Sequence, residues 1–188
     1  MFRLFYILIS LLSVILSIPA YAADTSFAVT TNSFLDQGTL PTLYTCDGKD
    51  VSPELDWSNT PAKTQAFAII MNDPDAPNGN WYHWVVYNLP KDSKQILEGA
   101  PVPAGASMGK NSWDKLQYNG PCPPMGGPAH HYVFTVYALD SKLTLPAGAD
   151  GKAVEDALKS HVVQKAVITG VYSRWAVALP KGSGMSSK

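Results

Sequence analysis

The chain has 188 residues, of which 46% are hydrophobic and 15% are charged, and its formal net charge is −1 at pH 7. Because no run of basic residues is present, nucleic acids and anionic membrane surfaces gain no electrostatic support as partners. Fifteen prolines and fourteen glycines favour many loops between short strands over long helices.

Residues 1–22 have the pattern of a signal peptide. Arg3 precedes an apolar stretch from Leu4 to Ile18, and small residues end the segment at Ala22. The stretch is shorter than the about 20 residues that a membrane-spanning helix needs, so an uncleaved anchor is the weaker alternative. We predict cleavage near Ala22, export to a periplasmic or secreted location, and no transmembrane segment after cleavage.

Six later segments are predicted to be β-strands. They are rich in β-branched and aromatic residues and are bounded by Gly, Pro, Asn or Asp. Both alternating faces are apolar in residues 82–88, which indicates a strand that is covered on both sides. The six segments are residues 27–31, 55–57, 66–71, 82–88, 131–139 and 166–172.

One helix is predicted over residues 152–163. Val154, Leu158 and Val162 recur there at the i, i+4, i+8 spacing of an amphipathic helix. Asp150 is placed to cap its N-terminus. On this prediction, His161 lies on the surface of the helix.

A rigid polar loop separates two of the predicted strands. The sequence Asp73-Pro-Asp-Ala-Pro77 interrupts an apolar run, and Trp81-Tyr-His83 begins the next one. Proline fixes φ and removes a backbone donor, so this loop cannot become helical and loses little entropy on ordering. The pattern predicts a preformed polar site, with an acid and a histidine at one end of a sheet.

A second loop has the same character. Tyr118-Asn-Gly-Pro-Cys-Pro-Pro124 continues through Gly126-Gly-Pro128 to His130-His-Tyr132, where another predicted strand begins. A loop rich in proline and glycine therefore again delivers a histidine to the start of a strand.

Both loops, together with Thr45-Cys-Asp-Gly48 and Ile168-Thr-Gly-Val-Tyr172, resemble the phosphatidylethanolamine-binding protein family, in particular its bacterial Raf-kinase-inhibitor-like branch. The resemblance covers roughly residues 27–172. It implies an all-β fold in which a large central antiparallel sheet packs on a smaller sheet, with one or few peripheral helices. We expect a single domain of this kind over residues 23–180 and a flexible tail over residues 181–188.

The resemblance also implies a pocket for a small anion such as phosphate or a phospholipid headgroup. Imidazole N–H groups suit an anion, a carboxylate can fix the tautomer of a neighbouring imidazole, and aromatic walls suit an ethanolamine-like cation. By motif position, the pocket core is Asp73, His83 and His130, its walls are Trp81 and Tyr132, and its rim is the loop with Gly120, Pro121 and Pro123.

Several of these side chains also have simpler interpretations. Asp73 alone can cap its own turn before a proline, and His83 alone can be a core histidine. Asp75 is interpreted as a carboxylate that structures its loop. His131 stands where the family often has arginine, and we expect it to point to the opposite face. The other tryptophans are interpreted as core or rim packing: Trp57, Trp84 and Trp113.

Two cysteines in an exported protein suggest a disulfide between Cys46 and Cys122, although two buried thiols are the alternative. Such a bond would stabilise the protein by ~4 kcal/mol in the chain-entropy model. The resemblance places both cysteines in loops near the pocket, where the bond would pin the proline-rich loop.

The favoured function is that of an exported, non-enzymatic protein that binds a small anion, and modulation of a partner protein or enzyme is left open beside it. One alternative is a hydrolase that uses Asp73, His83 and His130 as acid–base groups, but no nucleophile lies in a recognisable elbow. Another alternative is a metal-binding protein, since two histidines and a carboxylate form a known ligand set. No cofactor is expected. The short chain after Trp175 predicts a more open pocket than in eukaryotic relatives.

Overall fold

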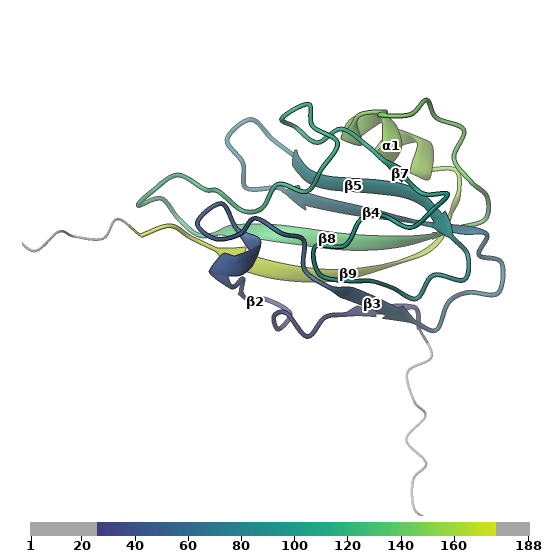
Figure 1. Ribbon diagram of the computed structural model, residues 1–188, viewed down its shortest axis with the longest axis horizontal. Helices are drawn as coiled ribbons and strands as arrows, with labels where there is room; N and C mark the ends of the chain where they lie inside the picture. The colour runs from purple at the N-terminus through teal and green to yellow at the C-terminus, as the bar shows by residue number, and fades with distance from the viewer. Residues whose placement is uncertain (1–25, 176–188) are drawn as a thin grey trace, which may run out of the picture.

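The computed structural model describes residues 26–175, which form two packed β-sheets, one α-helix and one 3₁₀ helix (Figure 1). The strands of the larger sheet are β2 (Gly38–Thr39), β4 (Ala66–Asp73), β5 (Trp81–Pro90), β7 (Ser107–Met108), β8 (His130–Leu139) and β9 (Val162–Tyr172). The smaller sheet contains β1 (Ala28–Thr30), β3 (Leu55–Ser58) and β6 (Gln95–Ile96). The helices are the 3₁₀ helix η1 (Thr42–Tyr44) and the α-helix α1 (Gly151–Leu158).

The strand order is β2-β9-β8-β4-β5-β7 in the larger sheet and β1-β3-β6 in the smaller one. Neighbouring strands are antiparallel except for β2 and β9, which pair in parallel at two positions. The expected all-β architecture of a large sheet on a smaller one, with few helices, is confirmed. The six predicted strands are β1, β3, β4, β5, β8 and β9, whereas β2, β6 and β7 have two residues each and are too short for a recognisable pattern.

The strand β4 is buried on both faces. Phe67, Ile69 and Met71 belong to the core between the two sheets. Ala68 and Ile70 alternate with them and face a second core on the side of α1. Burying an isoleucine or phenylalanine side chain contributes roughly 1.5–3 kcal/mol, so both faces hold this strand strongly in place.

The same alternation continues in β5. Trp84 and Val86 pack between the sheets, while Val85 and Tyr87 pack on the side of α1. The prediction of a strand covered on both sides is therefore confirmed for this segment.

The helix α1 covers the outer face of the larger sheet (Figure 1). Asp150 caps it as predicted, since its side chain accepts a hydrogen bond of 2.8 Å from the backbone N–H of Ala153. Gly151 begins the helix directly on the ring of Tyr82, where an added Cβ would lie 2.5 Å from Cγ of that ring. The close approach explains why glycine occupies this position.

The predicted end of the helix was wrong. The helix stops at Leu158, and Val162 begins β9, where it pairs with Leu139. His161 lies in the turn between them and donates its backbone N–H to Leu158 O. Val162 has the spacing of a fourth-residue helical position only by coincidence. Its pairing with Leu139 of β8 places it in β9 instead.

The outer edge of β9 is only partly covered. On that side, the neighbouring strand within the described part of the chain is β2, which pairs only with Gly170 and Val171 of β9. Residues 162–168 therefore form an open strand edge. Gln164 and Lys165 are exposed along this edge.

The predicted disulfide is present between Cys46 and Cys122, whose Cα atoms are 5.4 Å apart. It joins the loop after η1 to the second proline-rich loop. Within residues 26–175, no helix has the length and apolar content needed to cross a membrane. The predicted signal peptide (1–22) and tail (181–188) lie outside the described residues and stay predictions.

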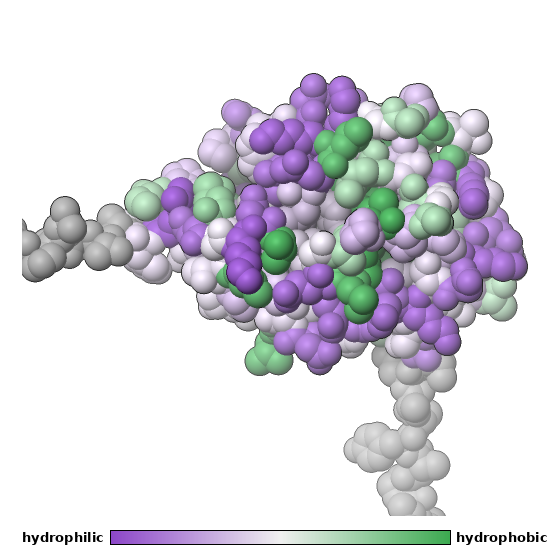
Figure 2. All heavy atoms as spheres, viewed as in Figure 1, coloured by the Kyte–Doolittle hydropathy of each residue, from purple (hydrophilic) through white to green (hydrophobic). Residues whose placement is uncertain are grey.

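The face of the molecule drawn in Figure 2 has a mixed surface, on which hydrophilic residues predominate and hydrophobic residues form small separate groups. Scattered apolar residues of this kind are normal on a folded protein.

Candidate functional site

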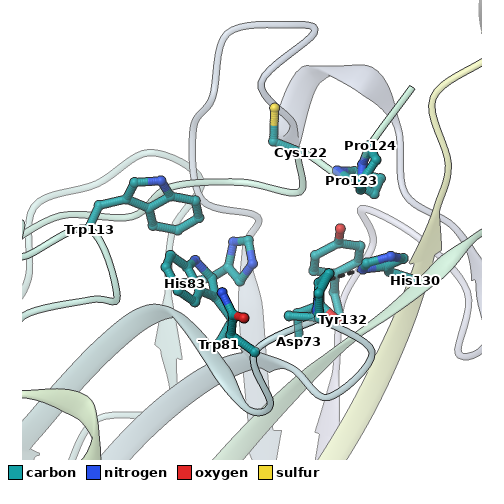
Figure 3. Close-up of a pocket in the computed structure, with 12 residues that line it drawn as sticks. Asp73, Trp81, His83, Trp113, Cys122, Pro123, Pro124, His130 and Tyr132 are labelled. Atoms are coloured by element: carbon teal, nitrogen blue, oxygen red, sulfur yellow. Dashed lines mark hydrogen bonds and ion pairs between the residues drawn. The ribbon is translucent and has the colours of Figure 1, made fainter. Parts of the chain in front are cut away.

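Three neighbouring strands of the larger sheet have termini at the same end of the sheet. β4 ends at Asp73, β5 begins at Trp81, and β8 begins at His130. Because β4 is antiparallel to both neighbours, its end lies between their starts. The two proline-rich loops therefore come together beside the same cavity (Figure 3).

The cavity has a volume of about 220 Å³. It is smaller than the pockets of about 300–1,000 Å³ that hold drug-sized ligands, so it suits a small polar group. Its lining residues are Asp73, Ala76, Pro77, Asn78, Trp81, His83, Trp113, Cys122, Pro123, Pro124, His130 and Tyr132.

A buried contact between Asp73 and His130 lies at the centre of this end of the sheet. Oδ2 of Asp73 is 2.7 Å from Nδ1 of His130, and both side chains are less than one-tenth exposed. The other carboxylate oxygen, Oδ1, accepts a hydrogen bond from the backbone N–H of Asp75 at 2.8 Å. Asp73 therefore caps its own turn, as in the simple interpretation, and also holds Nδ1 of His130.

His83 is placed by an irregularity in the strand pairing. Met71 pairs with Trp84 and Asn72 pairs with Tyr82, so the register shifts by one residue and His83 has no partner in β4. Such bulges change the direction of a side chain and are common beside functional sites. His83 pairs instead with Asn119, whose backbone N–H donates to the His83 carbonyl at 3.1 Å.

The protonation state of His83 follows from its contacts. Its Nδ1 lies 2.6 Å from the carbonyl oxygen of Asn119, which can only accept, so Nδ1 carries the proton. Burial lowers the pKa of His83, although the Asn119 carbonyl and the charge of Asp73 oppose this effect. A neutral imidazole with its proton on Nδ1 has a lone pair on Nε2.

Tyr132 brings a buried hydroxyl group to the cavity. The residue is fully buried, and its hydroxyl oxygen has no hydrogen-bond partner in the described part of the chain. Burial and the nearby carboxylates of Asp73 and Asp75 raise the pKa of Tyr132, so the group stays a neutral phenol. Leaving a buried hydroxyl group without a hydrogen bond costs about 1–3 kcal/mol.

Aromatic rings form one wall of the cavity. Trp113 packs edge-on against Trp81 and His83, with ring centroids 5.3 Å and 5.0 Å apart. The interpretation of Trp113 as a rim residue agrees with this position, but its direct contact with His83 was missed. It comes from a separate loop, and no local motif links it to the two polar loops.

Gly120 and Pro121 were predicted to form the rim but do not line the cavity. The Gly120 backbone N–H donates to Oδ1 of Asp50 at 2.5 Å. The carbonyl of Pro121 accepts from the backbone N–H of Cys46 at 3.1 Å. They fasten the loop to the neighbouring segment, while Pro123 and Pro124 farther along form the wall.

Asp75 and His131 lie outside the cavity. Oδ2 of Asp75 accepts hydrogen bonds from the backbone N–H of His131 at 2.8 Å and from its Nδ1 at 2.7 Å. These bonds hold the pKa of the Asp75 carboxyl below its ordinary value. As interpreted from the sequence, Asp75 structures its loop and His131 points away from the cavity. Three further lining residues were not named from the sequence, Ala76, Pro77 and Asn78, whereas Cys122 and Pro124 belong to the loop that was expected to form the rim.

Within residues 26–175, no group of three or more His, Cys, Asp or Glu side chains is arranged to hold a metal ion. The alternative of a metal-binding site therefore gains no support from the geometry.

A family model described as phosphatidylethanolamine-binding protein matches residues 30–173. The chain belongs to the phosphatidylethanolamine-binding protein family. A relative from Methanothermobacter thermautotrophicus, named UPF0098 protein, is 43% identical over 148 residues, which are 77% of this chain and 97% of the relative. The resemblance predicted from the two loops is thus confirmed.

Two solved structures of this fold are similar to the chain. The structure of YbcL from Escherichia coli has a TM-score of 0.75 and 34% identity, covering 78% of this chain and 98% of YbcL. That of CT736 from Chlamydia trachomatis has a TM-score of 0.74 and 31% identity, covering 80% of this chain and 99% of CT736.

The buried, neutral state of His83 predicts a pH dependence of stability. In the unfolded chain a histidine has a pKa of about 6.5, whereas burial lowers that of His83 in the folded protein. As pH falls through 6.5, the unfolded chain binds a proton that the folded protein does not, so the free energy of unfolding decreases. Urea unfolding at pH 7.5 and 5.5 should show a smaller decrease for His83→Gln than for wild type, by at most about 1.4 kcal/mol per pH unit. Equal decreases in both proteins would contradict a neutral His83.

Proposed function

We propose that this protein binds a small phosphate-type anion in the cavity at the end of β4 and catalyses no reaction on it. The observation that carries the proposal is the convergence of three buried polar side chains, His83, His130 and Tyr132, on one small cavity. Two of them are histidines whose Nδ1 atoms are already occupied, so their Nε2 atoms are left for a ligand.

The three groups differ in what they offer to a ligand. Nδ1 of His130 is hydrogen-bonded to Oδ2 of Asp73 at 2.7 Å, so the Nε2 atom of His130 is the one left for a ligand. The phenol of Tyr132 can donate a hydrogen bond. Neutral His83 accepts at Nε2, which suits a P–OH group. The set therefore matches a singly protonated phosphate group better than a fully deprotonated one.

The size and walls of the cavity define the rest of the ligand. A volume of about 220 Å³ holds a headgroup but leaves longer chains outside. Trp81 and Trp113 offer aromatic surface to an ammonium group, a contact worth about 1 kcal/mol. A phosphoethanolamine-like ligand fits both properties, and it agrees with the name of the family.

A hydrolase has weaker support. The cavity-lining residues include no serine, threonine or lysine, and Cys122 is held in a disulfide. Covalent catalysis by these common nucleophiles is therefore not supported. Incubation with phosphodiester and phosphomonoester substrates tests the alternative, because binding without release of product is the expected result.

Replacing Tyr132 should separate ligand affinity from stability. Tyr132→Phe removes an unpartnered hydroxyl, so we expect unchanged or higher stability without ligand but weaker binding of phosphoethanolamine, by about tenfold for one hydrogen bond worth ~1.4 kcal/mol. Calorimetric titration and urea unfolding measure the two effects. Tyr137→Phe, on the opposite side of the sheet, is the control and should keep wild-type affinity. Wild-type affinity in Tyr132→Phe would show that this hydroxyl does not contact the ligand.

The acceptor role of His83 predicts a pH dependence of binding. A phosphate monoester gains a P–OH group as pH falls through its second pKa of about 6, so phosphoethanolamine should bind more tightly at pH 5.5 than at pH 7.5. The change should be smaller in His83→Gln, because the Gln side chain can donate as well as accept. Affinity that does not change with pH would argue against a hydrogen bond from P–OH to His83.

We also propose that the protein is exported, with support from its disulfide, since such bonds persist in oxidising compartments. Expression of the full chain in a bacterial host should give a mature protein that begins at Ala23. Intact-mass analysis of the periplasmic and medium fractions measures this. A protein that keeps residues 1–22 in the cytoplasmic fraction would contradict export.

A further inference from the structure

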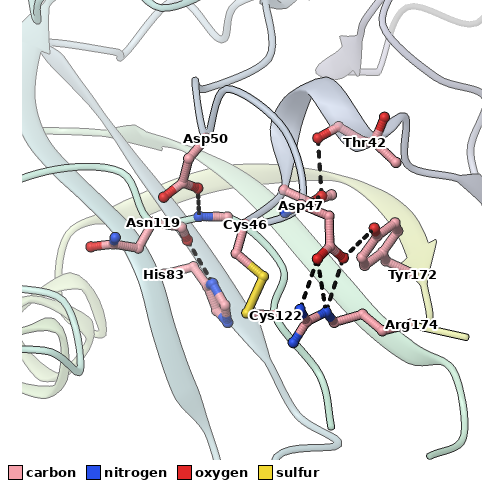
Figure 4. Close-up of a disulfide and its surroundings, with 11 residues drawn as sticks. Thr42, Cys46, Asp47, Asp50, His83, Asn119, Cys122, Tyr172 and Arg174 are labelled. Atoms are coloured by element: carbon pink, nitrogen blue, oxygen red, sulfur yellow. Dashed lines mark hydrogen bonds and ion pairs between the residues drawn. A yellow bond between two sulfur atoms is a disulfide. The ribbon is translucent and has the colours of Figure 1, made fainter. Parts of the chain in front are cut away.

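The disulfide between Cys46 and Cys122 is both accessible and part of the cavity. Both cysteines are exposed, and Cys122 lines the cavity beside Pro123 and Pro124. Figure 4 shows the bond at the junction of the two loops, close to His83. Exposed disulfides are typically the labile ones, because a thiolate can reach a sulfur atom without unfolding the protein.

The cavity wall next to this bond has few other connections. Pro123 and Pro124 have no backbone N–H, so they cannot donate hydrogen bonds to the body of the protein. The flanking backbone bonds are Cys46 N–H to Pro121 O at 3.1 Å on one side and Gly126 N–H to Arg174 O at 2.8 Å on the other. Between these points, Pro123 is buried and Pro124 O accepts a hydrogen bond from Gly127 N–H at 3.2 Å, while the disulfide is the covalent bond that joins residues 122–124 to the Cys46 loop.

The partner loop is anchored more firmly. Asp47 follows Cys46 and accepts hydrogen bonds from the Arg174 side chain at 2.8–3.0 Å and from the Tyr172 hydroxyl at 2.7 Å. The Tyr118 hydroxyl also donates to the carbonyl of Tyr44 at 2.7 Å. The disulfide thus connects the proline-rich loop to a loop that is fixed at the end of β9.

We propose that Cys46–Cys122 is a thiol–disulfide exchange site for a dithiol reductant, and that reduction of this bond weakens anion binding in the cavity. The second part rests on the proposed function. The dithiol is either a small molecule or the exposed dithiol of a reductase. The noncovalent bonds of Asp47 and Tyr118 keep the fold together after reduction, while the wall of residues 122–124 loses its tie.

The exchange balances as a two-electron transfer. A thiolate of the dithiol attacks one protein sulfur, forms a mixed disulfide and releases the other cysteine as a thiolate. The second thiol of the reductant then displaces the remaining cysteine. The reductant becomes a disulfide, and its two protons and two electrons end on the two cysteine thiols.

The first experiment measures whether the folded protein is reduced. Oxidised protein is incubated with dithiothreitol, quenched with iodoacetamide and weighed by mass spectrometry, while circular dichroism follows the fold. We expect two alkyl groups to be added to folded protein, at a rate that sub-denaturing urea leaves unchanged. A rate that rises with urea in parallel with unfolding would place the bond out of reach in the folded state and overturn the proposal.

The second experiment measures the effect on the cavity. Phosphoethanolamine should bind about tenfold more weakly to reduced than to oxidised protein, within the usual range for coupled sites. The double variant Cys46→Ser/Cys122→Ser is the control. Its affinity for phosphoethanolamine should equal that of reduced wild type and should not change when dithiothreitol is added. Equal affinities in the oxidised and reduced states would overturn the coupling.

Hydrogen exchange of the Gly126 and Gly127 amides gives a readout that needs neither the ligand nor the double variant. Faster exchange after reduction is expected, because the wall loses its tie to the Cys46 loop. Unchanged exchange would overturn the proposal. If oxidised protein fails to bind phosphoethanolamine, the proposed function fails separately, and exchange alone then decides whether the disulfide controls the wall.

Discussion

The burial of β4 on both faces is the constraint on which the rest of the structure depends. Side chains of a strand alternate between its two faces, so a shift of one residue would exchange the two sets of apolar contacts. Phe67 and Ile69 face one core, while Ala68 and Ile70 face the other, and exchanging the large Phe67 with the small Ala68 would make such a shift costly. The end of the strand, and with it Asp73, is therefore fixed relative to β5 and β8.

Asp73 links the fixed end of β4 to the polar residues of the cavity. One carboxylate oxygen shapes the loop that follows β4, and the other holds His130 on the neighbouring strand. On the opposite side, the register shift in β5 frees His83 from regular pairing and allows Asn119 to hold it. Two imidazoles in the same cavity thus have different partners, a carboxylate and a carbonyl.

The sequence predicts features that depend on local chemistry. Alternation, β-branched residues and proline-rich breaks located the six longer strands, and the motifs of the two loops indicated the family. Features that depend on pairing over long distances were missed. Pairing with β8 determines where β9 begins, so the helical spacing of Val162 wrongly predicted a longer helix. Tertiary packing also placed Trp113 against His83 and directed Gly120 and Pro121 toward the Cys46 loop, and no local pattern in the sequence encodes these contacts.

The open edge of β9 has a consequence for behaviour at high concentration. Unpaired backbone groups along residues 162–168 form a template onto which a second molecule could add a strand. Lys165 is exposed in the middle of this edge, so two molecules that met there in an antiparallel arrangement would bring like charges together. The charge of Lys165 thus opposes this pairing, at a place far in the sequence from the residues that form the cavity.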